Sequence, residues 1–154
     1  LLGKEGDGFK GIMVNFENER LELSIHAHMV AQLALEESIK YAKAREAFGK
    51  PIFNQQVIMH KLVDMATLVE ISKEYNYRVA AMMDAKKNVS KEVSMAKNFA
   101  CQACDKVVFD AVQIHGGYGY AKEYLVERLY RDSRVISIGG GTTEIMKNVI
   151  GNFL

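Results

Sequence analysis

Proline, the residue that interrupts helices most strongly, occurs only once in this chain of 154 residues, at Pro51. On both sides of it, apolar residues recur at spacings of three and four over long stretches, which is the period of an amphipathic α-helix. Strong helix formers such as alanine, leucine, lysine and glutamate are abundant. The sequence therefore predicts an all-α fold.

Turn signals divide this helical pattern into five segments. The run Gly49-Lys50-Pro51 is expected to end the first helix, because glycine suits the left-handed position after a helix and proline cannot continue one. Asn54 and Ser90 are suitable N-caps for the second and third helices, and Thr142 or Thr143 opens the last. The expected helices cover residues 15–48, 55 to about 84, 90–116, 123–133, and 142 or 143 to the C-terminus.

Long helices joined by short loops favour antiparallel neighbours, so the expected architecture is an up-down four-helix bundle. The length predicts a single domain over residues 1–154. Because Leu1 is not a methionine, we expect this domain to be a fragment of a longer chain. The residues expected to face the core are Ile25, Met29, Leu35, Ile39 and Ala42 in the first helix, Ile58, Leu62, Met65, Val69, Val79 and Met82 in the second, and Val93, Ala100, Cys104, Val107, Ala111 and Ile114 in the third.

Composition and charge give no support to several classes of function. Hydrophobic residues make up 49% and charged residues 25%, with a formal net charge of +1, so nothing favours binding to nucleic acid. No apolar run is long enough for a bilayer, and no secretion signal is visible. Cys101 and Cys104 form a C-x-x-C, but no second pair of ligands lies at zinc spacing. We therefore expect no metal site, and we interpret both cysteines as small buried helix residues in a reducing compartment.

Two glycine clusters, residues 116–119 and 139–141, could let a ligand approach the backbone closely. The first is typical of a helix end and turn. The second leads into a helix start, whose free N–H groups can bind a ligand, and spacing alone leaves a ligand site and a plain loop equally open. Arg45 could bind a phosphate and Phe48 could stack on a flat ring, although a solvated arginine and a core phenylalanine are the commoner roles.

A series of short motifs follows along nearly the whole chain: Leu2-Gly3-x-Glu5-Gly6-x-Gly8-Phe9, Glu19-Arg20-Leu21, Ala44-Arg45-x-x-Phe48-Gly49-Lys50-Pro51, Asn54-Gln55-Gln56, the segment Asp110–Tyr120, Tyr130-Arg131-Asp132, and the segment Ile138–Ile145. In this order they resemble the C-terminal domain of the acyl-CoA dehydrogenase family. No single motif is decisive, but their order makes the resemblance specific.

The resemblance implies a helical bundle that follows an N-terminal helical domain and a middle β-domain. Such enzymes oxidise an acyl-CoA to the trans-2-enoyl-CoA with FAD and pass electrons to an electron-transfer flavoprotein. They are usually homotetramers, in the bacterial cytoplasm or the mitochondrial matrix. The residues that match flavin contacts are Arg45 and Phe48, which would reach the FAD of a neighbouring subunit, then Gln56, then Gln113, Gly116 and Gly117 on the ADP portion, and Thr142 and Glu144 at the start of the last helix.

The catalytic base needs a separate argument, because many family members carry it as a glutamate at the position of Gly140, which cannot take a proton. A smaller group, similar to isovaleryl-CoA and long-chain acyl-CoA dehydrogenases, instead places a glutamate on the first long helix, directly before an arginine. Glu19 and Arg20 match that pair. The resemblance thus implies that Glu19 removes the α-proton and that Arg20 positions it or the active-site loop.

Two alternatives stay open at this point. An acyl-CoA oxidase shares the chemistry but delivers electrons to oxygen, and a bundle kept only for assembly has no catalysis at all. Because the flavin and acyl pockets need walls from other domains, the isolated chain is expected to bind FAD weakly and to be inactive. Acyl chain length is not readable, although Gly140 could leave room for branched or longer acyl groups.

Overall fold

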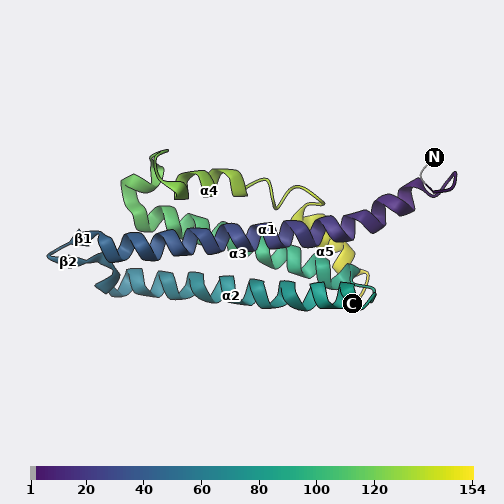
Figure 1. The fold of residues 1–154 in the computed structure, drawn as a ribbon, viewed down its shortest axis with the longest axis horizontal. Coiled ribbons are helices and arrows are strands. Elements are labelled where there is room, and N and C mark those ends of the chain that lie inside the picture. Colours follow the sequence, from purple (N-terminus) through teal and green to yellow (C-terminus); the bar gives the residue numbers. More distant parts are fainter. Residues whose placement is uncertain (1–2) are drawn as a thin grey trace.

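The computed structural model describes residues 3–154, so Leu2 of the first motif lies outside the described residues. Within this range the chain forms five α-helices, in agreement with the all-α prediction: α1 (Gly8–Ala44), α2 (Gln56–Asp84), α3 (Ser90–His115), α4 (Leu125–Ser133) and α5 (Thr143–Gly151). Consecutive long helices run antiparallel and all three pack on one another, while α4 packs on α1 and α3, and α5 packs on α3 (Figure 1). The expected up-down bundle is thus present, with two short helices in place of a fourth long one.

The ends of α1 differ from the predicted ones. The helix begins at Gly8, seven residues before the expected start, and its first turns extend beyond the rest of the bundle (Figure 1). It ends at Ala44, before the expected Phe48, because the chain turns into an antiparallel hairpin of β1 (Glu46–Ala47) and β2 (Lys50–Pro51). Phe48 and Gly49 both have positive φ (56° and 77°), as the tight turn of a two-residue hairpin loop requires.

The starts of α2, α3 and α5 were predicted to within one residue, whereas α4 begins two residues after the expected residue 123. A short 3₁₀ turn, η1 (Ile52–Asn54), follows the hairpin, so the cap of α2 is Gln55 and not Asn54. Val89 precedes α3, which makes Ser90 the first helical residue. Thr142 caps α5 as expected, because its hydroxyl accepts a hydrogen bond from the backbone N–H of Ile145 at 3.4 Å.

The residues predicted to face the core are confirmed better for α2 and α3 than for α1. All six residues named for α3 are buried, and so are Leu62, Met65, Val69 and Val79 of α2. On α1, by contrast, Ile25 and Met29 are 41% and 47% exposed, so their assignment to the core was wrong. The inward face of α1 carries small residues instead, which let neighbouring helices approach closely. The buried residues of α1 are Arg20, Ser24, Ala27, His28, Val30, Ala31, Ala34, Leu35, Ser38 and Ala42.

The two cysteines are buried and free, which confirms their interpretation as small helix residues. Burial raises the pKa of Cys101 to about 11 and that of Cys104 to about 12. Since the thiolate is the reactive form, neither side chain is a nucleophile near neutral pH. No helix within the described range 3–154 is both long and apolar enough to cross a bilayer.

One buried carboxylate ties α2 to α3. Asp110 is 1% exposed, and its two oxygens accept hydrogen bonds from Lys61 at 2.7 Å and from Lys106 at 2.6 Å. Burial raises the pKa of Asp110, but the hydrogen bonds and charges of both lysines outweigh burial and hold the pKa below its ordinary value. The ion pairs therefore keep the carboxylate charged inside the bundle.

Replacing Asp110 by alanine is expected to lower the free energy of unfolding by about 2 kcal/mol, because two charge-assisted hydrogen bonds are lost. The effect is present above the ordinary carboxyl pKa of about 4, and it shrinks as the pH falls through the lowered pKa of Asp110. Urea denaturation at several pH values measures it. Glu70→Ala is the control, since this pair with Lys73 lies at the surface and should change stability by less than about 0.5 kcal/mol.

Candidate functional site

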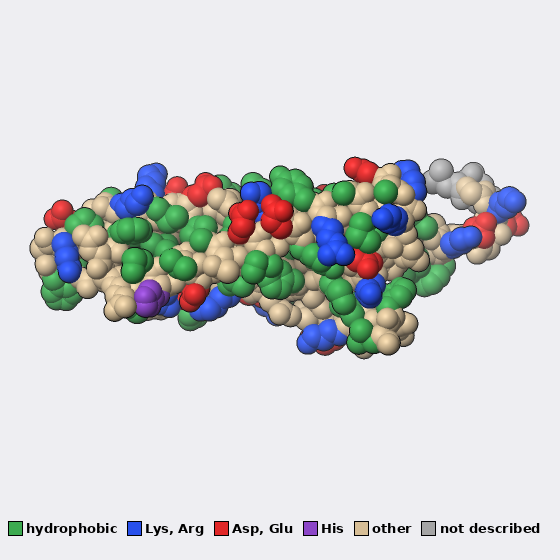
Figure 2. Space-filling view, turned by 90° about the horizontal axis from the view of Figure 1, so that it is seen from below, with side chains coloured by type: hydrophobic (Ala, Val, Ile, Leu, Met, Phe, Trp, Pro, Cys, Tyr) green, Lys and Arg blue, Asp and Glu red, His purple; other side chains and the backbone are tan. Residues whose placement is uncertain are grey.

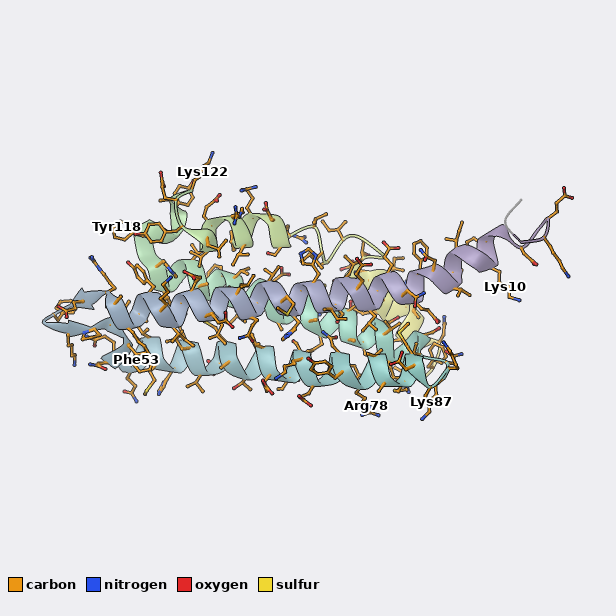
Figure 3. All side chains as sticks on the ribbon, viewed as in Figure 1. Lys10, Phe53, Arg78, Lys87, Tyr118 and Lys122 are labelled. Atoms are coloured by element: carbon orange, nitrogen blue, oxygen red, sulfur yellow. The ribbon has the colours of Figure 1, made fainter. Side chains whose placement is uncertain are left out.

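The predicted site residues fall into two groups at opposite ends of α1. We call the first the glycine-loop end, formed by Glu19, Arg20 and residues 139–144, and the second the hairpin end, formed by residues 45–56 and 113–118. In Figure 3, Tyr118 and Phe53 mark the hairpin end, far from Lys10 on the first turns of α1. With a rise of 1.5 Å per residue, Glu19 and Arg45 lie roughly 40 Å apart along the helix.

At the glycine-loop end, side chains from two helices hold the backbone of the loop that precedes α5. The Nε of Arg20 on α1 donates a hydrogen bond to the carbonyl of Gly140 at 3.4 Å. From α3, the ammonium of Lys97 donates to the carbonyl of Gly141 at 2.7 Å, and Nδ2 of Asn98 donates to the carbonyl of Thr143 at 3.2 Å. The loop is therefore fixed from both sides, although it contains three consecutive glycines.

Glu19 faces this loop directly. A Cβ placed on Gly140 would lie 3.5 Å from Oε1 of Glu19 and only 2.6 Å from Cδ1 of Leu23, one turn further along α1. The backbone of Gly140 also has a φ of 62°, which residues with a side chain rarely adopt. Leu23 and Glu19 of α1 therefore occupy the space beside Gly140. The half-buried carboxylate of Glu19 lies where a side chain at position 140 would otherwise be.

The start of α5 adds polar groups to the same end. Glu144 is exposed, and the hydrogen bond from its own backbone N–H, followed by that from the Thr142 hydroxyl, lowers its pKa. A carboxylate in the first turn also complements the positive end of the helix dipole. The structure thus brings Glu19, Arg20, Thr142 and Glu144 to one end.

The hairpin end holds a cavity of about 500 Å³, lined by Tyr41, Arg45, Ile52, Ile114, His115, Gly116, Gly117 and Tyr118. Gly116 has a φ of 60°, and apart from the adjoining backbone no described atom lies within 4 Å of a Cβ built on it or on Gly117, so a ligand can approach this backbone. The guanidinium of Arg45 lies 5.8 Å from the centre of the Tyr118 ring. The cavity brings together three of the predicted flavin contacts, Arg45, Gly116 and Gly117.

The other three predicted contacts lie at the hairpin end but do not line this cavity. Phe48 is 94% exposed at the tip of the hairpin, so a core role for it is wrong. Gln56 and Gln113 are exposed as well. A ligand that touches all of them would have to extend out of the cavity along the surface.

Sequence reasoning missed the stacked pair at the back of the cavity. The rings of Tyr41 and His115 lie 4.2 Å apart, and the Tyr41 hydroxyl donates to the carbonyl of His115. The Nδ1–H of His115 donates to the carbonyl of Ala111 at 2.8 Å, and burial lowers the pKa of this histidine. Both residues therefore form a neutral aromatic wall.

Lys97 was also missed, although the sequence contains a signal for it. It lies four residues after Val93 and three before Ala100, on the stripe that was predicted to face the core. A lysine on such a stripe needs a buried hydrogen-bond partner, and that partner is the glycine loop.

The conformation of the loop supports a specific test. Gly141 has a φ of 105°, outside the regions open to residues with a side chain, whereas the φ of Gly139 is ordinary and a Cβ there meets only a carbonyl at 3.7 Å. Gly141→Ala is expected to destabilise the domain by about 1–3 kcal/mol. Gly139→Ala, the matched control, should change stability by less than about 0.5 kcal/mol. Equal effects in thermal denaturation would contradict the assigned role of Gly141.

Comparison with known proteins gives consistent matches. The sequence model described as "Acyl-CoA dehydrogenase, C-terminal domain" matches residues 6–154. The chain is 48% identical over 99% of its length to a caffeyl-CoA reductase–Etf complex subunit of Acetobacterium woodii, and 47% identical over its whole length to an acyl-CoA dehydrogenase of Bacillus subtilis. The crystal structure of a probable acyl-CoA dehydrogenase from Mycobacterium abscessus superposes with a TM-score of 0.96 at 46% identity, over 98% of this chain and 40% of that one. The chain spans 40% and 41% of the two curated relatives.

Proposed function

Since the chain belongs to the acyl-CoA dehydrogenase family and matches its C-terminal domain, we propose that it is the C-terminal part of a longer, three-domain flavoenzyme. In this proposal the enzyme removes the α-proton and the β-hydride of an acyl-CoA thioester and forms the trans-2-enoyl-CoA. The observation that carries it is the position of Glu19, whose carboxylate faces Gly140 in a loop fixed by Arg20 and Lys97. The base that other members carry on the loop is here supplied by α1.

The residues at the hairpin end fit the diphosphate of FAD. A diphosphate needs a cationic partner and close access to the backbone, and Arg45 offers the first while Gly116 and Gly117 offer the second. Exposed Phe48 and Gln113 can contact the parts of the dinucleotide outside the cavity. When bound, FAD supplies the acceptor for the hydride.

The hairpin end and the glycine-loop end are too far apart to contact one flavin. A separation of roughly 40 Å exceeds the reach of a single dinucleotide, so the hairpin end and the glycine-loop end must serve different FAD molecules. We therefore propose a homo-oligomer in which each hairpin end completes the flavin site of a neighbouring subunit, with the tetramer as the expected form. Exposed apolar side chains offer a surface for such contacts. Figure 2 shows several in patches on the side viewed from below, and those of α2 include Val57, Met59, Val63, Ile71 and Tyr77.

Each residue at the glycine-loop end then has a chemical task. The carboxylate of Glu19 accepts the α-proton, which makes it the catalytic base. Arg20, which follows Glu19 in the sequence, is buried, and its hydrogen bond to the carbonyl of Gly140 keeps the loop against the base. Thr142 and Glu144 present the first turn of α5 to the flavin of the same subunit.

An electron-transfer flavoprotein is the proposed electron partner. The Acetobacterium relative is named as a subunit of a complex with such a flavoprotein, which supports this partner over oxygen. The proposed location, the bacterial cytoplasm or the mitochondrial matrix, follows from that partner.

The test uses the full-length protein with FAD bound. Under anaerobic conditions an acyl-CoA should bleach the flavin absorbance, and the reduced enzyme should then reduce an electron-transfer flavoprotein. Hydrogen peroxide formation in air at the same rate would favour the oxidase alternative. Absence of bleaching with short, long and branched acyl-CoAs would favour the assembly-only alternative and contradict the proposal.

A further inference from the structure

Lys97 is a fully buried lysine for which the reaction proposed above gives no direct task. It is 1% exposed, on a face of α3 that otherwise packs through small and apolar residues such as Val93, Ala96 and Ala100. A buried ammonium is unfavourable unless hydrogen bonds compensate for its lost hydration. A methionine of similar length would fill the same space without that penalty, so the charge needs an explanation beyond packing.

The position of the Lys97 ammonium explains why a charge is buried here. The Nζ of Lys97 reaches across from α3 to the carbonyl of Gly141 at 2.7 Å, while Arg20 reaches from α1 to the carbonyl of Gly140. Two cations from different helices thus hold consecutive carbonyls of the loop that faces Glu19. Burial, together with the nearby charge of Arg20, lowers the pKa of Lys97, and the carboxylate of Glu19 opposes that shift only in part.

We propose that Lys97 is a positioning residue of the active site, which fixes the glycine loop from the α3 side so that Glu19 and the start of α5 keep their relative place. This inference rests on the proposed function for its catalytic consequence, but the effect on the loop does not. Without the lysine, the described side chains of α1 and α3 hold this region only through the bond from Arg20 to Gly140, at 3.4 Å, and the bond from Asn98 to Thr143, the first residue of α5. Three consecutive glycines then have many more conformations to sample.

The test compares Lys97→Met with wild type in the full-length, FAD-loaded enzyme. Hydrogen exchange of the amides of residues 139–144 should be at least tenfold faster in the variant, while that of the middle of α3 stays unchanged. The kcat per bound flavin should fall by 10–100-fold, because displacement of reacting groups by about an ångström has effects of that size. The KM and the FAD content should change by less than threefold, since the hairpin end is untouched.

Controls separate positioning from a general packing role. Ser94→Ala is the matched variant, because Ser94 is also fully buried on α3 but donates only to the carbonyl of Ser90 within its own helix. It should leave loop exchange and kcat within twofold of wild type. Lys97→Arg keeps a cationic donor and should recover most of the loop protection. If Lys97→Met does not fold, Lys97→Gln takes its place with the same expected direction.

The outcomes distinguish this inference from the proposed function. Unchanged loop exchange and unchanged kcat in the folded Lys97→Met variant would overturn the role of Lys97, whatever the reaction. The variant could instead show faster loop exchange while no acyl-CoA reduces the flavin of the wild-type enzyme. That result would support the positioning role of Lys97 and contradict the proposed function. Equal losses in the Ser94→Ala and Lys97→Met variants would show that the effect is one of helix packing, which also overturns the proposal.

Discussion

Replacing Glu19 by glutamine in the full-length enzyme is expected to lower the rate of flavin bleaching by acyl-CoA by 10²–10⁴-fold, while FAD stays bound. Glutamine has almost the same shape as glutamate, so the contact with the Gly140 loop remains, but it cannot take up a proton. The expected size is that of a missing general base. Stopped-flow absorbance under anaerobic conditions measures the rate, and the flavin-to-protein absorbance ratio measures the FAD content.

Glu22→Gln is the matched control for this prediction. Glu22 lies on the same helix, three residues away, but its side chain is exposed, so the same chemical change should leave bleaching within twofold of wild type. Normal bleaching in the Glu19→Gln enzyme would rule out Glu19 as the base. A loss of bound FAD together with the loss of bleaching would mean that Glu19 acts on the structure of the site and not on the proton.

Most of the fold could be predicted because it depends on local patterns. The stripe of α3, with Val93, Ala100 and Val107, follows the helical period, and all three residues are buried. The inward face of α1 could not be predicted in the same way. It packs through alanine and serine, which carry little hydrophobic signal, while larger residues such as Ile25 lie outward.

The hairpin after α1 shows a second limit of local reasoning. Gly49 and Pro51 indicated correctly that the helix stops, but they could not show that the chain would leave it at Arg45. The early exit depends on the pairing of β1 with β2, in which Glu46 lies opposite Pro51. Two residues per strand are too few for a recognisable strand pattern.

The candidate site shows the same division. The resemblance to a family indicated which residues matter, and the predicted helix over residues 15–48 already placed Glu19 and Arg45 near its opposite ends. Neither could show which side chains of the other helices complete each group. The buried Lys97 and the half-buried Tyr41 were missed, because their role depends on contacts with residues more than 40 positions away in the sequence. Such contacts have no signature in local spacing.

The hairpin end leads to the second large expected effect, on the affinity for FAD. Arg45→Met in the full-length enzyme removes the guanidinium from the cavity beside Gly116 and Gly117. A hydrogen bond to a charged group contributes about 1.5–3 kcal/mol, and about 1.4 kcal/mol corresponds to tenfold in affinity. The Kd for FAD should therefore rise by roughly 10–100-fold, as measured by reconstitution of the apoenzyme.

The matched control for Arg45 is Lys43→Met, at the same end of α1. Lys43 is a cation too, but its ammonium lies 5.6 Å from the ring centre of Phe53, and it does not line the cavity. Loss of charge alone should therefore leave the Kd for FAD within threefold of wild type. Arg45→Lys should fall between the two, because an ammonium keeps the charge but not the two-pronged contact with a diphosphate. If Lys43→Met and Arg45→Met weakened FAD binding equally, the effect would come from the overall charge of this end and not from a specific contact of Arg45. An unchanged Kd in Arg45→Met would remove the hairpin end from the flavin site, and with it the reason to expect that neighbouring subunits complete each other's flavin sites.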